Sequence, residues 1–232
     1  MRPERFSVAI AAFSLLLCSV SLWADTLVLP TAIPYQADKR LELVEQYRHM
    51  AADSVPAQQL RRVALSATAV AGEDAPSQAH TEYAITLLER ALAAFPGDPE
   101  LLAAKGSATT MLARYTDQNT GKAMLLAKRG IRSMDRAVKR APENLGARLQ
   151  RAINGLFMPR FLNRLPVAEK DFTYILAHTD ESVGPDFKAM VIYYLLRTCK
   201  AAEGENCKAR YHNELPPEGG EYWRQRIASL DF

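Results

Sequence analysis

The sequence predicts an all-α protein of antiparallel helix pairs. Apolar residues recur at three- and four-residue steps along most of the chain, and this spacing is typical of one face of a helix. Helix-stopping and helix-starting residues separate these stretches, and strand patterns are weak throughout. We expect amphipathic helices over 36–53, 57–72, 77–95, 99–114, 121–141, 144–158, 166–178, 185–203 and 219–230.

The third of these helices shows the pattern most clearly. Its apolar residues form one stripe along the helix, and polar residues fill the positions between them. The stripe consists of Ala84, Leu87, Leu88, Ala91, Leu92 and Phe95.

The breaks between helices carry capping residues. After Pro96 and Gly97, Asp98 can cap the next helix and Pro99 can occupy its first position. Residues 142–144 repeat this arrangement, and a polar loop covers 116–121. Links this short make successive helices antiparallel neighbours.

The N-terminus has the features of a secretory signal peptide. Arg2 and Arg5 give it a positive start. Residues 6–20 are almost wholly apolar, and Ala24 supplies a small residue before the polar chain begins. We expect cleavage after Ala24, so that 1–24 is the signal and the remaining 208 of the 232 residues are periplasmic or secreted.

Two alternatives to a cleaved signal stay open. The segment could be retained as an anchor, although its apolar run is shorter than the roughly 20 residues that a spanning helix needs. Cys18 follows a run of leucines, as in bacterial lipoprotein signals. Those signals, however, place a small residue directly before the cysteine, whereas Leu17 is large.

Residues 25–35 are expected to form an extended N-terminal arm. The run 26–33 is the best strand candidate in the chain, but Pro30 and Pro34 argue against a place in a sheet. Residues 36–232 then form a single helical domain, long enough to bury a sizeable core.

Cys199 and Cys207 are the two cysteines of the mature chain. Export places them in an oxidising compartment, so we expect them to form a disulfide. The alternative is a metal site shared with His212, but the ligands are too few and their spacing matches no standard zinc pattern. We therefore expect no metal.

Two breaks in the chain are similar to each other, because residues 90–96 align with 136–142 at an offset of 46. Here the sequence resembles the tetratricopeptide repeat family, whose second helix carries a small residue, an apolar residue, an alanine and a closing proline at fixed offsets. These positions are held by Ala84, Leu88, Ala91 and Pro96, then by Gly130, Met134, Ala137 and Pro142, and Gly106 holds the small position of a first helix.

The sequence also departs from that family. Its period exceeds the usual 34 residues or so, with the extra length around 116–122, and the first-helix tryptophan and tyrosine are absent. A third unit is degenerate at Ala168, Asp171, Phe172 and Leu176. The resemblance covers about 77–200, with the flanking helices as caps. It implies a helical solenoid that binds extended or helical peptide segments, in which the small residues serve packing.

The sequence offers no catalytic motif and no cofactor site. A nucleophile elbow, a phosphate-binding glycine loop and a His-Glu-x-x-His pair are all missing. The histidines at 49, 80, 178 and 212 show no ligand spacing. We therefore expect a protein that is not an enzyme.

Positive charge is concentrated in one segment. Residues 122–164 hold eleven basic and two acidic residues, a net charge of +9, while the rest of the mature chain carries −7. Within this segment Lys128, Arg132, Arg136 and Arg140 follow at four-residue steps and form a basic stripe on one helix face. The stripe could contact an anionic partner such as lipid headgroups or an acidic protein. It could equally be solvated or paired with acidic segments such as 180–181; nucleic acid is not expected after export.

A second candidate surface is apolar. In solenoids of this family the first helix of each unit tends to line the concave face. Leu149, Ile153, Leu156 and Phe157 lie along one such helix. They could form a groove for an apolar segment or lipid-like ligand, or simply pack in the core.

These features favour an exported scaffold or adaptor that binds a protein partner in an envelope process such as assembly, transport or maturation. The alternative is a carrier or transport-accessory subunit that binds a small apolar or anionic ligand. An enclosed apolar cavity would favour the carrier, and an open groove rimmed by charge would favour the adaptor.

Overall fold

A computed structural model describes residues 26–50, 54–179, 183–204 and 206–231, and within these ranges the protein is helical and has no strand. The all-α prediction is therefore confirmed. The α-helices are α1 (Ala37–Arg48), α2 (Ala57–Ala69), α3 (Gln78–Ala94), α4 (Pro99–Met111), α5 (Thr120–Arg140), α6 (Leu145–Phe157), α7 (Leu165–Ala177), α8 (Pro185–Ala201), α9 (Cys207–Tyr211) and α10 (Glu221–Ala228).

Side-chain caps fix where several helices begin. Asp98 accepts from the Leu101 amide at the start of α4, and Asn144 accepts from the Ala147 amide at the start of α6. Asn119 caps α5 in the same way. These caps satisfy amides that have no partner within the helix, so the capping residues determine where each helix begins.

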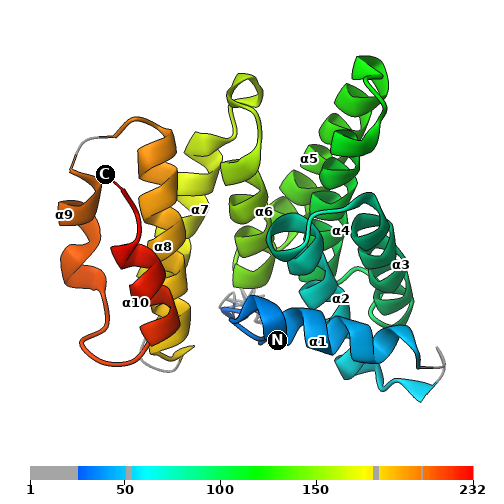
Figure 1. The fold of residues 1–232 in the computed structure, drawn as a ribbon, viewed down its shortest axis with the longest axis horizontal. Coiled ribbons are helices and arrows are strands. Elements are labelled where there is room, and N and C mark those ends of the chain that lie inside the picture. The colour runs from blue at the N-terminus through cyan, green and yellow to red at the C-terminus, as the bar shows by residue number, and fades with distance from the viewer. Residues whose placement is uncertain (1–25, 51–53, 180–182, 205, 232) are drawn as a thin grey trace, which may run out of the picture.

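The helices follow one another through space, from α1–α5 on the right of Figure 1, through α6, to α7–α10 on the left. Each helix from α1 to α5 packs on the next one, and α6, α7 and α8 do the same. In addition α2 contacts α4, α4 contacts α6, and α6 contacts α8. These four even-numbered helices therefore form a continuous row, which we call the inner row.

Two glycines allow α4 and α5 to cross closely. A Cβ atom on Gly106 would lie 2.8 Å from the carbonyl oxygen of Gly130, and one on Gly130 would overlap Thr110 and the Gly106 carbonyl. Both positions therefore need a residue without a side chain. These are the small positions expected from the family pattern.

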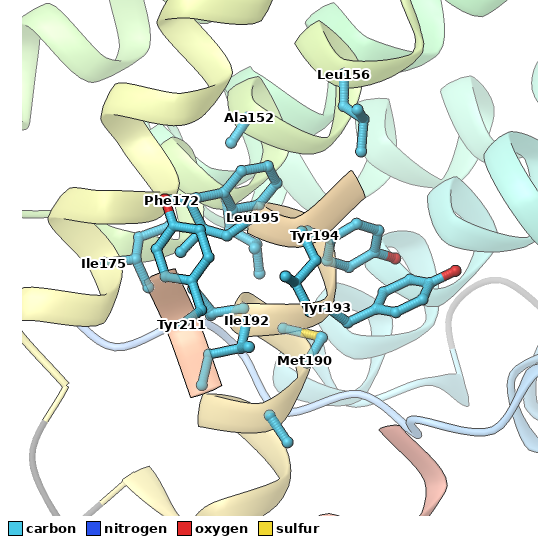
Figure 2. Packing of buried hydrophobic residues seen from close by; sticks show 14 of the residues in the cluster. Ala152, Leu156, Phe172, Ile175, Met190, Ile192, Tyr193, Tyr194, Leu195 and Tyr211 are labelled. Atoms are coloured by element: carbon cyan, nitrogen blue, oxygen red, sulfur yellow. The ribbon is translucent and has the colours of Figure 1, made fainter. Parts of the chain in front are cut away.

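Two main apolar clusters form the core. The N-terminal cluster joins α2, α3 and α4, and its fully buried residues include Leu65, Leu87 and Leu101. The C-terminal cluster surrounds α8, where Phe172 of α7 stacks on Tyr194 (Figure 2). The Tyr193 and Tyr194 rings also pack on Trp223 of α10.

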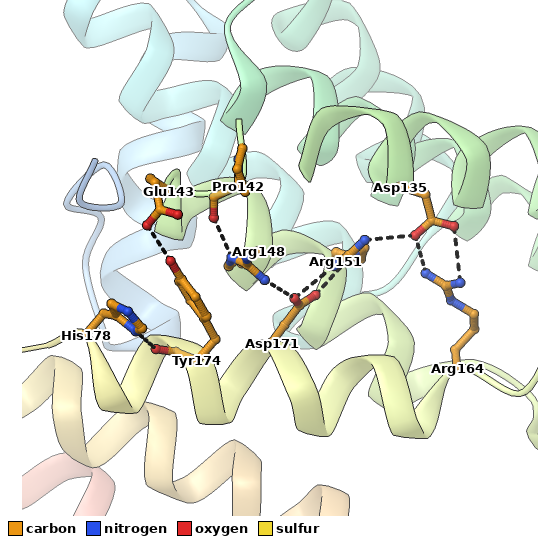
Figure 3. Close-up of polar contacts among 9 residues, drawn as sticks. All are labelled: Asp135, Pro142, Glu143, Arg148, Arg151, Arg164, Asp171, Tyr174 and His178. Carbon is orange, nitrogen blue, oxygen red and sulfur yellow. Dashed lines mark hydrogen bonds and ion pairs between the residues drawn. The ribbon is translucent and has the colours of Figure 1, made fainter. Parts of the chain in front are cut away.

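A partly buried ion network joins α5, α6 and α7 (Figure 3). The fully buried carboxylate of Asp171 accepts from Arg148 at 2.9 Å and from Arg151 at 2.7 and 2.8 Å. Asp135 accepts from Arg151 at 3.2 Å and from Arg164 at 2.6 Å. Three arginines of the basic segment therefore pair with carboxylates of the protein itself, two of them with the fully buried Asp171 and two with Asp135, whose side chain is 40% exposed.

Cys199 and Cys207 form a disulfide with a Cα–Cα distance of 5.9 Å. The bridge joins the end of α8 to the start of the short helix α9. Gly204 lies in the turn between them and donates its amide to the Cys199 carbonyl. A Cβ atom on Gly204 would meet the Cys199 sulfur at 2.8 Å, so the turn favours glycine there.

Candidate binding cavity

The extended N-terminal arm, described from residue 26 to residue 36, lies against the helical domain. Val28 donates its amide to the Glu143 carbonyl at 3.0 Å and accepts from the Leu145 amide at 2.8 Å. The arm thus pairs with the link between α5 and α6 as a single parallel β-bridge. This pairing fixes the first part of the arm across the molecule.

Glu100 holds the middle of the arm. Its carboxylate accepts from the Thr31 amide at 3.1 Å and from the Thr31 hydroxyl at 2.6 Å, and Arg61 donates to it at 2.7 Å. The Glu100 residue is only 2% exposed. A Cβ atom on Gly146 of α6 would overlap this carboxylate, so glycine leaves the space that it occupies.

Arg40 of α1 holds the end of the arm. Its guanidinium donates to the carbonyls of Pro34 at 3.0 Å and Tyr35 at 2.7 Å. The same group forms a bidentate pair with Asp74, at 2.6 and 2.7 Å. The Tyr35 ring meets Trp223 edge-on, so the arm contacts the C-terminal half of the protein as well.

A cavity of about 270 Å³ lies between the arm and the inner row. Arm residues 29–35 form one wall, and all four inner-row helices contribute to the others. The apolar side chains on these walls include Leu65, Met111, Leu149, Ile153, Phe157, Phe187 and Met190. The cavity therefore offers a mainly apolar interior with polar groups at a few points, as small-molecule sites do.

The structure brings three of the four predicted groove residues to this cavity. Leu149, Ile153 and Phe157 line it. Leu156 does not; it is 9% exposed and packs in the C-terminal cluster (Figure 2).

Glu73 is a partly buried acid on the cavity wall. The Tyr194 hydroxyl donates to it at 2.7 Å, and Arg197 lies 3.9 Å away. Burial raises the pKa of the Glu73 carboxyl, although the Tyr194 hydrogen bond and Arg197 oppose this. Burial likewise raises the pKa of Tyr194, so the tyrosine remains a hydrogen-bond donor.

Asn154 places a buried amide at the same wall. Its nitrogen donates to the hydroxyls of Ser107 at 2.9 Å and Thr110 at 2.7 Å. Its Oδ1 atom is buried and has no hydrogen-bond partner. An unsatisfied buried acceptor costs about 1–3 kcal/mol, so a ligand that donates a hydrogen bond there would gain affinity.

A second cavity of about 320 Å³ adjoins the first. Met111, Arg114, Asn154 and Phe157 line both. The second cavity is otherwise formed by the start of α5 and by the segment after α6, including Phe161, whose side chain is 73% exposed.

The predicted basic stripe lies apart from these cavities. Lys128, Arg132, Arg136 and Arg140 are all exposed on α5 and line neither cavity. No ion pair joins the stripe to any residue that the structure describes. The acidic residues 180–181, considered as internal partners, lie outside the described residues.

No cluster of three or more histidine, cysteine or acidic residues that could hold a metal occurs in the described part of the chain. Cys199 and Cys207 are joined to each other, and the His212 side chain is not among those described. Within the same residues, no helix is long and apolar enough to cross a membrane.

Comparison with known proteins gives no relative for this chain: no protein-family model, no curated protein and no solved structure matches it.

Asn154, Arg114 and the contacts of the arm were not predicted from the sequence. Asn154 interrupts an otherwise apolar helix face, and that interruption was a usable signal. Thr31 and Glu100 are 69 residues apart, and no sequence pattern linked them.

Proposed function

We propose that this protein is an exported, tetratricopeptide-like helical-repeat protein that binds a small apolar or anionic molecule beneath its own N-terminal arm and carries out no chemistry. One observation carries the proposal. The arm closes the inner row over an apolar cavity, which is the feature expected of a carrier and not of an open peptide groove.

The arrangement of the helices supports the solenoid part of the proposal. In such solenoids the first helices of successive units contact one another, as α2, α4, α6 and α8 do. Ala84, Leu88 and Ala91 of one expected unit are fully buried, and Met134 and Ala137 of the next are nearly so. The extra length of the repeat falls in the turn η3 (Leu112–Tyr115), the following loop and the 21-residue helix α5.

The disulfide supports the proposed compartment. Disulfides persist in the periplasm and outside the cell, and are rare in the cytosol. Together with the predicted signal at 1–24, the Cys199–Cys207 bridge favours export.

The size of the cavity favours a small molecule. Ligand pockets commonly measure about 300–1,000 Å³, and the cavity of about 270 Å³ is just below the lower end of that range. A helical peptide would need the arm to leave first, because the arm occupies the inner face.

An adaptor role is the second candidate, and a different surface favours it. The exposed side chains of Leu125 (62%) and Phe161 (73%) are large and apolar. Leu125 lies on α5 together with the exposed basic stripe, so this helix could bind an acidic protein partner of the envelope or anionic lipid.

The test is native mass spectrometry of the protein purified from its own envelope. Ala69 lies on the wall of the cavity beneath the arm, and Ala69→Trp should fill part of that cavity. Ala93→Trp, at an exposed position of α3, is the matched control. Wild type and Ala93→Trp should carry a bound small molecule that Ala69→Trp lacks.

Two results would count against the carrier. One is wild-type protein that carries no bound molecule. The other is a molecule retained equally by Ala69→Trp. Capture of one stoichiometric protein partner by all three forms, with loss on charge reversal of the stripe, would favour the adaptor.

A further inference from the structure

The charged residues on the cavity wall differ in whether their side chains have a partner within the protein. Glu100 is held by Thr31 and Arg61, and Glu73 is held by Tyr194. Arg40 pairs with Asp74. Among the described residues that line the cavity beneath the arm, Arg114 is the one charged residue whose side chain has no ion pair or hydrogen bond within the protein.

Arg114 is also the one charged residue among those lining the second cavity. It lies in η3, directly after α4, and its side chain is exposed. A solvated guanidinium at the junction of two apolar cavities can receive an anion whose apolar part lies inside.

Asn154 supplies an independent observation at the same junction. It lines both cavities, it is 7% exposed, and its Oδ1 atom lacks a hydrogen-bond donor. Ser107 and Thr110 already accept from its nitrogen, which fixes the amide against α4. The free acceptor therefore selects a ligand that carries a hydroxyl or an amide N–H.

We infer that the cavity takes a medium-chain carboxylate with a hydroxyl or amide N–H near its head group. The carboxylate pairs with Arg114, the donor bonds to Asn154 Oδ1, and the chain lies among Met111, Ile153 and Phe157. This inference rests on the proposed carrier function and specifies its ligand.

Isothermal titration calorimetry with three eight-carbon probes tests the ligand class. The probes are 3-hydroxyoctanoate, octanoate and 1-octanol. We expect Kd to rise about tenfold from the first to the second and again to the third, since each step loses one polar contact. Added salt should weaken octanoate binding and leave octanol binding unchanged.

Three variants assign the contacts. Arg114→Gln should abolish the preference for octanoate over octanol, whereas Arg129→Gln, a control at an exposed arginine away from both cavities, should preserve it. Asn154→Ala should abolish the preference for the hydroxylated acid. If Asn154→Ala fails to fold by circular dichroism, Asn154→Ser replaces it, and Arg114→Gln tests the head group independently.

The failures can be told apart. If octanol binds as tightly as octanoate, or Arg114→Gln leaves octanoate binding unchanged, the inference is wrong; the carrier proposal survives provided Ala69→Trp blocks octanol. If no probe binds and the native protein carries no ligand, both are wrong.

Discussion

The arginines of the basic segment fall into two groups, those paired with carboxylates of the protein and those exposed on its surface. Arg148 and Arg151 both donate to the buried Asp171, whereas the stripe arginines on α5 are exposed. The sequence predicted one basic segment, but the structure divides it. Charges next to a buried carboxylate stabilise the fold, and only the others are free for a partner.

Asp171→Asn should strongly destabilise the protein. It removes the negative charge on which two arginines depend, and breaking a buried pair in this way costs about 3–5 kcal/mol. Urea denaturation measures the loss. The control is Glu203→Gln, whose pair with Arg160 is largely exposed; we expect a loss of no more than about 1 kcal/mol. Equal effects of the two substitutions would contradict this account of the network.

At the scale of the helix, packing depends on where two backbones meet. Gly130→Ala should destabilise the protein by about 1–3 kcal/mol, because the new methyl group overlaps Thr110 and the α4 backbone. Gly121→Ala, in the first turn of the same helix, meets its nearest atom at 3.5 Å and should be neutral or slightly stabilising. Thermal unfolding of both variants checks this, and a stable Gly130→Ala protein would show that the crossing is looser than described.

The helices could be predicted from sequence, and the arrangement of the arm could not. Capping residues such as Asp98 and Asn144 act over three residues, so they locate helix starts directly. The short helix α9 was missed, because five residues show too little periodicity. The contact between Thr31 and Glu100 depends on the tertiary fold, and so does the division of α6 between cavity and core.

Over the whole molecule, charge is polarised onto the α5 face. Replacing Arg132 and Arg136 with glutamate should leave the unfolding midpoint unchanged or raise it slightly. Both side chains are exposed, and the substitutions relieve repulsion between basic residues four positions apart. If this face binds an anionic partner, the variant should bind vesicles of anionic lipid more weakly than the wild-type protein does. The remaining binding should also depend less on salt concentration. A marked loss of stability would instead mean that the stripe pairs within the protein.

The arm connects the two halves of the protein. Leu27 and Tyr35 pack on the C-terminal cluster, and Ile33 packs on the N-terminal cluster. Its hydrogen bonds to Glu143, Leu145 and Glu100 fix it between these contacts. The arm is therefore part of the fold, and it closes the cavity.

Amide hydrogen exchange of the arm tests this claim most directly. The Val28 and Thr31 amides should exchange slowly, because they donate to the Glu143 carbonyl and the Glu100 carboxylate. In Glu100→Leu, which removes the acceptor, the Thr31 amide should lose protection while the amides of α8 keep theirs. If both arm amides exchange in the wild-type protein as fast as in an unfolded chain, the arm does not close the cavity and the account is wrong.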